Sequence, residues 1–329
     1  MRQVNVAYCG WGERWPLGRL ADDGRTLLFE YAPEALTQGL ELSPLYLKLR
    51  PQAYGDFPAY QHRLPGLLAD SLPDGWGLLL MDRVFRQQGL RHPGPLDRLA
   101  FIGYRAMGAL CFIPAQDADA QAPDWGLLAL AQESARVLAG EAGAALRELA
   151  LTGGSPQGAR PKALVQYDMA SGQISTRPDA AGSPWLVKFP AQGEHQEVCA
   201  IEQCYAELAR DCGLETPDSR WFEVSAKLAA FGAARFDQEA GLRVPVHSLA
   251  GLLHIDFRLP GAADYTTFLR ATRLLTRDER EVEKAYDRAV FNVLFHNRDD
   301  HPKNLAWRLG RDRHWRLAPA FDLTFSAGP

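Results

Sequence analysis

The strongest constraint on the fold of this chain is one polar stretch near its C-terminal end. The stretch runs from Phe295 to Trp307 and reads FHNRDDHPKNLAW, and six of the eight positions from 296 to 303 carry charged or titratable side chains. Apolar sequence lies on both sides of it, so it is not a solvated tail. A plain solvated loop is the alternative interpretation, and the neighbouring elements decide between the two.

A long helix is expected to deliver this stretch. We expect it to begin at Thr276, because Thr276 and Glu279 have the form of a capping box. The apolar positions that follow have the i, i+3, i+4 spacing of one buried face; they are Val282, Ala285, Tyr286, Ala289, Val290, Val293 and Leu294. The polar stretch would then hang from the C-terminal end of a rigid helix.

The spacing of Asp299 and Asn304 points to phosphoryl transfer. Asp-x-x-x-x-Asn is the spacing of the protein-kinase catalytic loop, where the aspartate holds the attacking hydroxyl and the asparagine binds Mg²⁺. The segments LAWRL and WRLAPA bracket GRDRH, which predicts a hairpin. Such a hairpin can bring Asp322 beside Asn304 as a second oxygen ligand, and ligands of this type suit Mg²⁺.

A kinase also needs a loop that covers the phosphates. Gly153, Gly154 and Gly158 supply one whose backbone amides could approach phosphate oxygens. The G-x-x-x-x-G-K-[ST] pattern of a Walker loop is absent. An ordinary turn is the alternative at this point.

A lysine on a strand and an acid on the next helix complete the kinase pattern. Lys188 lies in the predicted strand WLVKF, where it either snorkels at an edge or is held for a ligand. Glu202, near the start of the following helix, can pair with it, and Glu197 and Glu207 are rivals. The order of loop, strand lysine, helix acid, Asp-x-x-x-x-Asn and hairpin is more specific than any one part.

Composition excludes several classes of protein. The 36 basic and 40 acidic residues give a net charge of −4, so there is no global electrostatic case for nucleic-acid binding. No apolar run is long enough to span a membrane, and the N-terminal sequence lacks the apolar region of a signal peptide. Five cysteines without a C-x-x-C pair are typical of reduced core thiols, so we expect a cytoplasmic protein without a membrane partner.

The length of 329 residues predicts about two domains, and the polar segment AQDADAQAPDW marks the boundary between them. Short strands with a DDG hairpin turn dominate the first part, where a helix also follows the turn-forming SLPDG. One helix is expected from about 125 to 151. We divide the chain into residues 1–115, residues 116–240 with the phosphate loop and strand lysine, and residues 241–329 with the catalytic loop.

These motifs together resemble the HipA-type serine/threonine kinases, the toxins of bacterial type II toxin–antitoxin pairs. NRDDHPKN is similar to the family's N-x-D-x-H-x-K-N, PAFDL to its P-A-x-D-L, SPQGARPKA to its S-x-x-G-A-x-x-K, and ARFD to its linker E-R-F-D. The resemblance implies an α+β, protein-kinase-like two-lobe fold with a small strand-rich N-terminal subdomain. Family members continue beyond the position of Pro329 with helical sequence, so the helical C-terminal lobe is expected to be incomplete.

The resemblance also implies roles for individual residues. Asp299 would be the catalytic aspartate, and Asn304 and Asp322 would be the Mg²⁺ ligands. Ser155 matches the loop serine that members of the family autophosphorylate, and a phosphate there would repel those of ATP. The residues expected at the nucleotide are Lys188 at the α- and β-phosphates, Gly154, Ser155 and Gly158 in the loop, Arg235 and Phe236 at adenine, Asp237 near the ribose, and Glu202 beside the lysine.

The function expected is that of an ATP- and Mg²⁺-dependent serine/threonine kinase toxin. By resemblance, its substrate would be a translation-related protein such as an aminoacyl-tRNA synthetase. Its partner would be a helix-turn-helix antitoxin of the HipB type, through which any DNA contact would be indirect.

Two alternatives stay open. One is a pseudokinase, or a shortened subunit that binds nucleotide or antitoxin without turnover. The other is a metal-dependent phosphohydrolase in which His296, His301 and Asp300 would hold the metal, although such enzymes usually draw histidine ligands from separate helices. Transfer of label from ATP to protein would separate the three.

Overall fold

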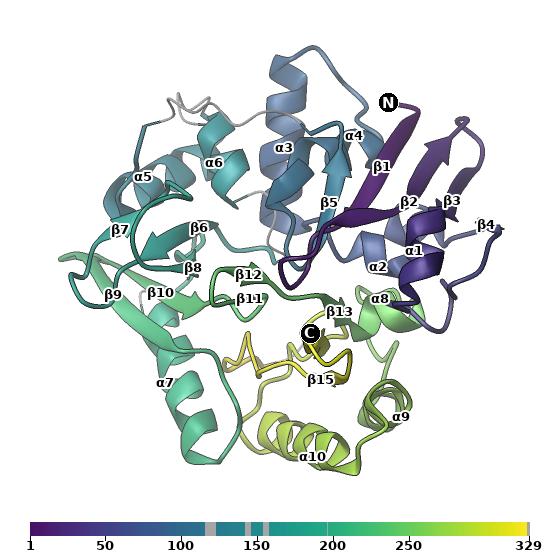
Figure 1. Cartoon of the computed structure of the whole chain (residues 1–329). Coiled ribbons are helices and arrows are strands. Elements are labelled where there is room, and N and C mark those ends of the chain that lie inside the picture. The colour runs from purple at the N-terminus through teal and green to yellow at the C-terminus, as the bar shows by residue number, and fades with distance from the viewer. Residues whose placement is uncertain (116–122, 142–145, 154–157, 196, 328–329) are drawn as a thin grey trace.

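The computed structural model describes residues 1–115, 123–141, 146–153, 158–195 and 197–327. Helices and strands alternate along these residues and form three packed parts (Figure 1). Among the described residues, no helix has both the length and the apolar character needed to cross a membrane. Gly154 and Ser155, expected in the phosphate loop, lie outside the described residues.

The N-terminal part is a five-stranded antiparallel sheet with helices packed around it, as Figure 1 shows in purple and blue. The strands, in sheet order, are β4 (Ala53–Tyr54), β3 (Leu27–Tyr31), β2 (Trp15–Asp22), β1 (Gln3–Tyr8) and β5 (Leu110–Ile113). Buried and exposed residues alternate along β3, as expected for a strand with one face on a core. The helices are α1 (Pro33–Gln38), α2 (Gly66–Ala69), α3 (Gly75–Gln87) and α4 (Pro95–Ile102), with the short 3-10 helices η1 (Ala59–Gln61) and η2 (Gly103–Arg105).

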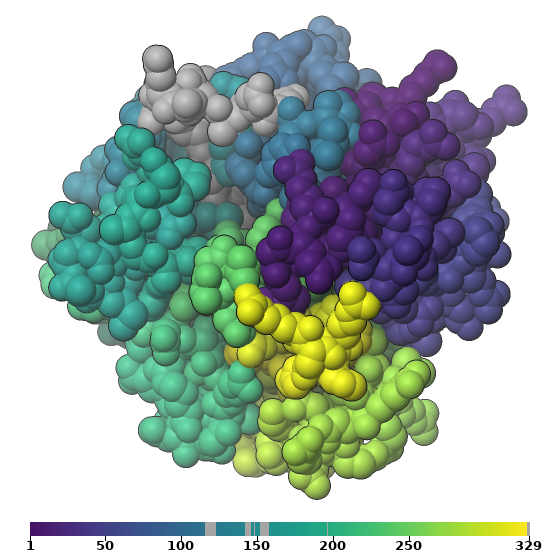
Figure 2. Space-filling view, in the orientation of Figure 1, coloured from purple at the N-terminus to yellow at the C-terminus, as the bar shows by residue number. Residues whose placement is uncertain are grey.

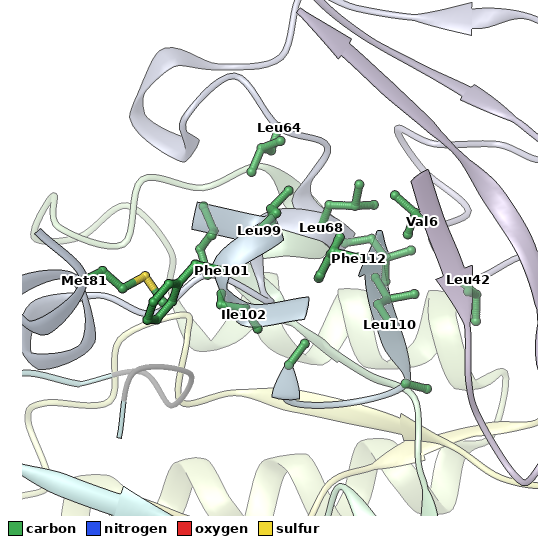
Figure 3. Close-up of a cluster of buried hydrophobic side chains, with 14 of the residues drawn as sticks. Val6, Leu42, Leu64, Leu68, Met81, Leu99, Phe101, Ile102, Leu110 and Phe112 are labelled. Atoms are coloured by element: carbon green, nitrogen blue, oxygen red, sulfur yellow. The ribbon is translucent and has the colours of Figure 1, made fainter. Parts of the chain in front are cut away.

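The core of this part lies between the sheet and its helices. Figure 3 shows Val6 and Phe112 from the sheet facing Leu68, while Met81 from α3 contacts Phe101 from α4. All five side chains are at most 2% exposed. Burial of that extent contributes about 1.5–3 kcal/mol for each large apolar side chain, so this packing stabilises α4 against the sheet and α3 against α4.

The middle part is a second five-stranded sheet, shown in teal and green in Figure 1. The expected helix from 125 to 151 is wrong, because two helices occupy this range and residues 142–145 between them lie outside the described residues. The strands in sheet order are β7 (Ile174–Ser175), β6 (Lys162–Tyr167), β8 (Ser183–Lys188), β10 (Leu228–Ala234) and β9 (Ser219–Ser225). The helices are α5 (Leu127–Leu138), α6 (Leu146–Gly153) and α7 (Val198–Asp211).

The C-terminal part combines three helices with a three-stranded antiparallel sheet. The predicted hairpin is confirmed, since β14 and β15 pair with Trp307 opposite Leu317. The elements are α8 (Leu249–Leu253), α9 (Tyr265–Thr276), α10 (Glu279–Leu294), β13 (Val246–Ser248), β14 (Ala306–Leu309) and β15 (Trp315–Leu317), preceded by the short pair β11 (Gln238–Glu239) and β12 (Leu242–Arg243).

The prediction for helix α10 is wrong in two details. Its N-cap is Asp278, whose carboxylate accepts the Arg280 amide, whereas Thr276 ends helix α9 and donates its hydroxyl to the preceding turn. The apolar face is also narrower than its periodicity suggests. Val282, Ala285 and Ala289 are buried, whereas the exposed apolar residues on this helix are Tyr286 at 58%, Val293 at 62% and Leu294 at 68%. Periodicity predicts an apolar face on the helix, but its burial depends on which neighbouring elements pack against that face.

The expectation of five core thiols is also partly wrong. Cys111 and Cys199 are buried, but Cys204 on α7 and Cys212 just beyond its end are exposed. The five cysteines are free thiols.

Segments that are far apart in the sequence lie side by side. Figure 2 shows the yellow C-terminal segment against the purple N-terminal one. The Trp11 indole donates to the Leu309 carbonyl at 2.9 Å, and the Arg313 guanidinium donates to the Gln38 carbonyl at 3.1 Å. The N-terminal part therefore packs directly on the C-terminal part.

Candidate active site

Most of the residues predicted for the site meet around one cavity of about 190 Å³. The predicted site residues that line it are Gly158, Lys188, Glu202, Arg235, Phe236, Asp237, Asn304 and Asp322. They come from the segment before β6, from β8 and α7, from the link after β10, and from both sides of the β14–β15 hairpin. Asp299 precedes Asn304 in the same loop and does not itself line the cavity.

Lys188 lies at the centre of the charged groups in this cavity. It ends strand β8, is 8% exposed, and its ammonium donates to the carboxylates of both Glu202 and Asp322. Glu202 is 1% exposed on helix α7, which holds it from one side, and Asp322 approaches from the loop after β15. Of the three glutamates considered for the lysine, the structure brings Glu202 to it, so one cation joins the sheet, the helix and the C-terminal part.

The charges in this cluster fix the ionisation of its members. Burial would raise the pKa of Asp322, but the nearby cations Lys188 and Lys162 outweigh it and hold that pKa well below its ordinary range. Burial would likewise lower the pKa of Lys188, and the carboxylates of Asp322 and Glu202 raise it instead. Lysine and aspartate are therefore both charged near neutral pH.

Two basic residues of the site were not assigned a role from the sequence. The Arg160 guanidinium contacts the second oxygen of Glu202 at 2.8 Å and the Glu194 carboxylate at 3.3 Å. Lys162 is 2% exposed, and burial together with the charge of Lys188 lowers its pKa to about 8. The cluster of basic residues in GARPK, directly after the glycine, was the available signal for them.

Asn304 and Asp322 offer the oxygen atoms that a hard cation prefers. The Asn304 amide nitrogen donates to the Asp299 carbonyl at 2.9 Å, which leaves its side-chain oxygen as the atom able to ligate a cation. Asp322 is ionised and has a left-handed backbone (φ 57°). This donor set fits Mg²⁺, which is commonly held by one or two protein oxygens together with substrate phosphates.

A metal site built from histidines is not supported. Among the residues that the structure describes, no group of three or more His, Cys, Asp or Glu side chains could hold a metal ion. His296 is exposed, and Asp300 accepts a hydrogen bond from the Tyr265 hydroxyl. Asp300 therefore ties the polar stretch to helix α9.

Asp299 is exposed in the loop before Asn304. Partial desolvation by the surrounding protein raises its pKa, and the like charges of Asp322 and Asp300 add to this although His301 opposes them. A raised pKa brings a carboxylate closer to the range in which it can accept and return a proton.

The link after β10 joins the cavity to the N-terminal part. The Arg235 guanidinium donates to both oxygens of Asp237, at 2.9 and 2.7 Å, and Asp237 also accepts the Gly108 amide at 2.7 Å. Asp237 is only 2% exposed. Phe236 packs against Phe321 with ring centroids 5.1 Å apart. In this arrangement Asp237 anchors the link to the turn before β5 in the N-terminal part.

The fold and the cavity define the class of protein. A five-stranded sheet with a strand lysine and a helix glutamate faces a helical part that carries the polar loop, which is the α+β, two-lobe arrangement of a protein kinase. The expected fold class is confirmed by a solved structure that shares it. This is the HipA, HipB and operator DNA complex of the Shewanella oneidensis MR-1 toxin–antitoxin system, with a TM-score of 0.68 at 17% identity over 97% of this chain and 76% of that one.

Family models identify the particular family. The model described as the HipA-like C-terminal domain matches residues 154–329, and the model described as the HipA N-terminal domain matches residues 11–113. The chain therefore belongs to the HipA family. A second solved structure, the Helicobacter pylori proinflammatory kinase CtkA, matches with a TM-score of 0.36 and 17% identity over 44% of this chain and 50% of that one. The comparison with curated proteins finds no match.

Proposed function

We propose that this protein is an ATP- and Mg²⁺-dependent serine/threonine kinase that acts as the toxin of a toxin–antitoxin pair. The observation that carries the proposal is the position of Lys188, whose ammonium lies between Glu202 and Asp322 in the cavity that Asn304 also lines. The lysine–glutamate pair and the metal-binding aspartate are the parts that protein kinases need in place for phosphoryl transfer.

Each residue has a defined task in this proposal. Lys188, oriented by Glu202, binds the α- and β-phosphates, and Asn304 and Asp322 hold Mg²⁺. When bound, Mg²⁺ supplies positive charge that offsets the charge developing on the transferred phosphoryl group. Asp299 orients the acceptor hydroxyl and takes up its proton.

The nucleotide base has a separate place in the proposal. The backbone at Arg235 and Phe236 faces adenine, and Asp237 supports that backbone through its ion pair with Arg235. Gly154 and Gly158 belong to the loop over the phosphates, and Ser155 is the proposed site of autophosphorylation.

The proposed partner is a helix-turn-helix antitoxin of the HipB type. The Shewanella relative of the same fold is described in a complex with HipB and operator DNA, which supports a partner of this kind. The net charge of −4 agrees with a DNA contact made through the partner. The proposed substrate is a translation-related protein, for which an aminoacyl-tRNA synthetase is the first candidate.

The proposal is tested by incubating the purified chain with γ-labelled ATP and Mg²⁺. We expect label on Ser155 in the wild-type protein and none in Asp299→Asn. Label that persists in Asp299→Asn contradicts the assigned mechanism. ATP binding without any transfer supports the second candidate.

That second candidate is a pseudokinase that binds nucleotide without turnover. The ion pair between Lys188 and Asp322 bears on this candidate, because the two side chains must separate before Lys188 can bind phosphate and Asp322 can bind a metal ion. In a kinase, ATP and Mg²⁺ together would separate Lys188 from Asp322. In a pseudokinase, the ion pair would persist when ATP binds. Binding of ATP that is independent of Mg²⁺ would therefore favour the pseudokinase.

A further inference from the structure

The start of helix α3 reaches the site from the N-terminal part of the chain. Three consecutive residues, Asp74, Gly75 and Trp76, contact residues 158–162, here called the glycine segment. The Trp76 amide donates to the Gly158 carbonyl at 3.2 Å, and its indole donates to the Lys162 carbonyl at 3.2 Å. These contacts place a helix of one part directly against the glycine segment of another.

The approach is too close for a side chain at position 75. A Cβ atom built on Gly75 would lie 2.7 Å from the Cα atom of Ala159, and the backbone of Gly75 has a positive φ of 28°. Real Cβ atoms do not approach backbone atoms so closely, so glycine is needed here. The backbone of α3 is therefore held in fixed register with the glycine segment.

Asp74 is the N-cap of α3, yet its side chain makes no capping hydrogen bond to its own helix. An aspartate at this position usually accepts an amide from the first turn. Instead, one carboxylate oxygen accepts the amide of Gly158, and the other contacts the Lys303 ammonium at 3.1 Å. One carboxylate thus holds the glycine segment and the polar loop together.

The pair formed with Lys303 is partly buried, since the side chains of Asp74 and Lys303 are 19% and 13% exposed. The Lys303 ammonium also lies 4.3 Å from the ring centre of Phe257. These contacts define the position of a lysine that is adjacent to Asn304 and lines the cavity. A charge pair with this little exposure is screened less than one on the surface.

We propose that Asp74 is a positioning residue that couples the N-terminal part to the site by fixing the glycine segment and the loop of Asn304 at one distance. The kinetic part of this inference rests on the proposed kinase function. The two oxygens of Asp74 have separable tasks, because the contact to Gly158 needs only an acceptor and the contact to Lys303 needs a negative charge.

Two substitutions separate those tasks. Asp74→Asn keeps an acceptor for Gly158 and removes the charge, so we expect kcat to fall about tenfold with the KM for ATP within about twofold of wild type. Asp74→Ala removes both contacts, so KM should rise about fivefold as well. Asp82→Asn is the matched control, because Asp82 lies on the same helix and pairs with Arg98 away from the cavity. Kinetics of both Asp74 variants that match this control overturn the inference.

A second measurement does not depend on catalysis. Hydrogen exchange of the Gly158 amide should be about tenfold faster in Asp74→Ala than in wild type, and within about threefold of wild type in Asp74→Asn. Unchanged exchange in Asp74→Ala overturns the inference even if the enzyme is a kinase. If the wild-type protein transfers no phosphate, the proposed function fails, and the exchange measurement still decides the role of Asp74.

Discussion

Two polar clusters of this protein look alike in composition but differ in what they can do. The first is the site cluster of Lys188, Glu202 and Asp322. The second, here called the junction network, consists of Ser43, Asp70, His247 and Ser248 and joins the N-terminal part to strand β13 of the C-terminal part. Each cluster contains at least one carboxylate side chain. Carboxylates pair with a lysine in the site cluster, and with a histidine and a serine hydroxyl in the junction network.

The junction network has the distances of a catalytic triad. The Ser43 hydroxyl lies 3.1 Å from one ring nitrogen of His247, and the other lies 2.7 Å from the Asp70 carboxylate. Asp70 also accepts the amide and the hydroxyl of Ser248 at 2.8 and 2.6 Å. However, Ser43 is 1% exposed and His247 is fully buried, so no substrate can reach the hydroxyl.

The site cluster differs because it remains accessible. The side chain of Asp322 is 33% exposed and borders the cavity, whereas that of His247 is 0% exposed. Asp70 and Ser248 border the cavity too, but their polar atoms are used within the network. Residue types and distances alone therefore do not define a site. Access and the ability to exchange partners do.

The largest expected effect is on the site cluster. Asp322→Asn removes the charge that pairs with Lys188 and that we propose binds Mg²⁺, so phosphate transfer should fall about 1000-fold or more. Transfer from γ-labelled ATP measures it, and Asp312→Asn, at an exposed aspartate, is the control. Activity within about tenfold of wild type would show that Asp322 is not needed for phosphate transfer. The site cluster would then not differ from the junction network in function.

The junction network should show the opposite behaviour. Asp70→Ala leaves His247 and Ser248 without their buried acceptor, so the free energy of unfolding should fall by about 3 kcal/mol. Urea denaturation measures this loss. Asp211→Ala, at an exposed residue, should change the same quantity by less than about 0.5 kcal/mol. Equal effects of the two substitutions would show that the network does not stabilise the fold.

A histidine beside the junction network should make stability depend on pH. Burial first, and then the charge of His247, lowers the pKa of His254 from 6.5 to about 4, and its ring accepts the Gly66 amide at 3.1 Å. Between pH 6.5 and about pH 4, this histidine is therefore protonated in the unfolded chain and neutral in the folded one. The contribution of neutral His254 to the free energy of unfolding is fully present above pH 6.5, and it is lost as the pH falls from 6.5 to about 4.

This effect can be separated from that of the aspartate. The pKa of Asp70 is lowered from an ordinary value of 3.8, so its contribution is lost only below about pH 4. Between about pH 7 and pH 5 the wild type should lose about 1 kcal/mol of unfolding free energy, and His254→Gln should lose less. The same pH dependence in His254→Gln would assign it to another group.

The smallest expected effect is that of Ser43→Ala. Loss of one buried hydrogen bond to His247 should lower the free energy of unfolding by about 1 kcal/mol and leave phosphate transfer within about twofold of wild type. Urea denaturation and labelled ATP measure the two quantities. A loss of activity without a loss of stability would give the triad-like geometry a chemical role.

Much of the site was predictable because it follows from spacing along regular elements. The hairpin of β14 and β15 was predicted from its strand and turn residues, and the strand lysine and helix glutamate from their order in the chain. The roles assigned to Asp299, Asn304 and Asp322 stay predictions. The predicted N-cap of α10 and the predicted burial of Tyr286 were wrong. Thr276 belongs to the preceding helix α9, and no neighbouring element covers Tyr286 among the described residues.

The pairing of distant residues at the site had no signal in the sequence, even where a residue itself stood out, as Arg160 does in GARPK. Asp74 contacts Gly158 across 84 positions and Lys303 across 229, and Arg160 shares Glu202 with Lys188. Local propensity carries no information on pairs this far apart, because their contact depends on how separate parts pack.

The sequence by itself determined many of the elements, the order of the motifs and the family resemblance, because periodicity, turn residues and short spacings act locally. Only the tertiary structure decided which charges meet. It put Lys188 between two carboxylates and buried Ser43 and His247 out of reach, because access and pairing depend on how the three parts pack against one another.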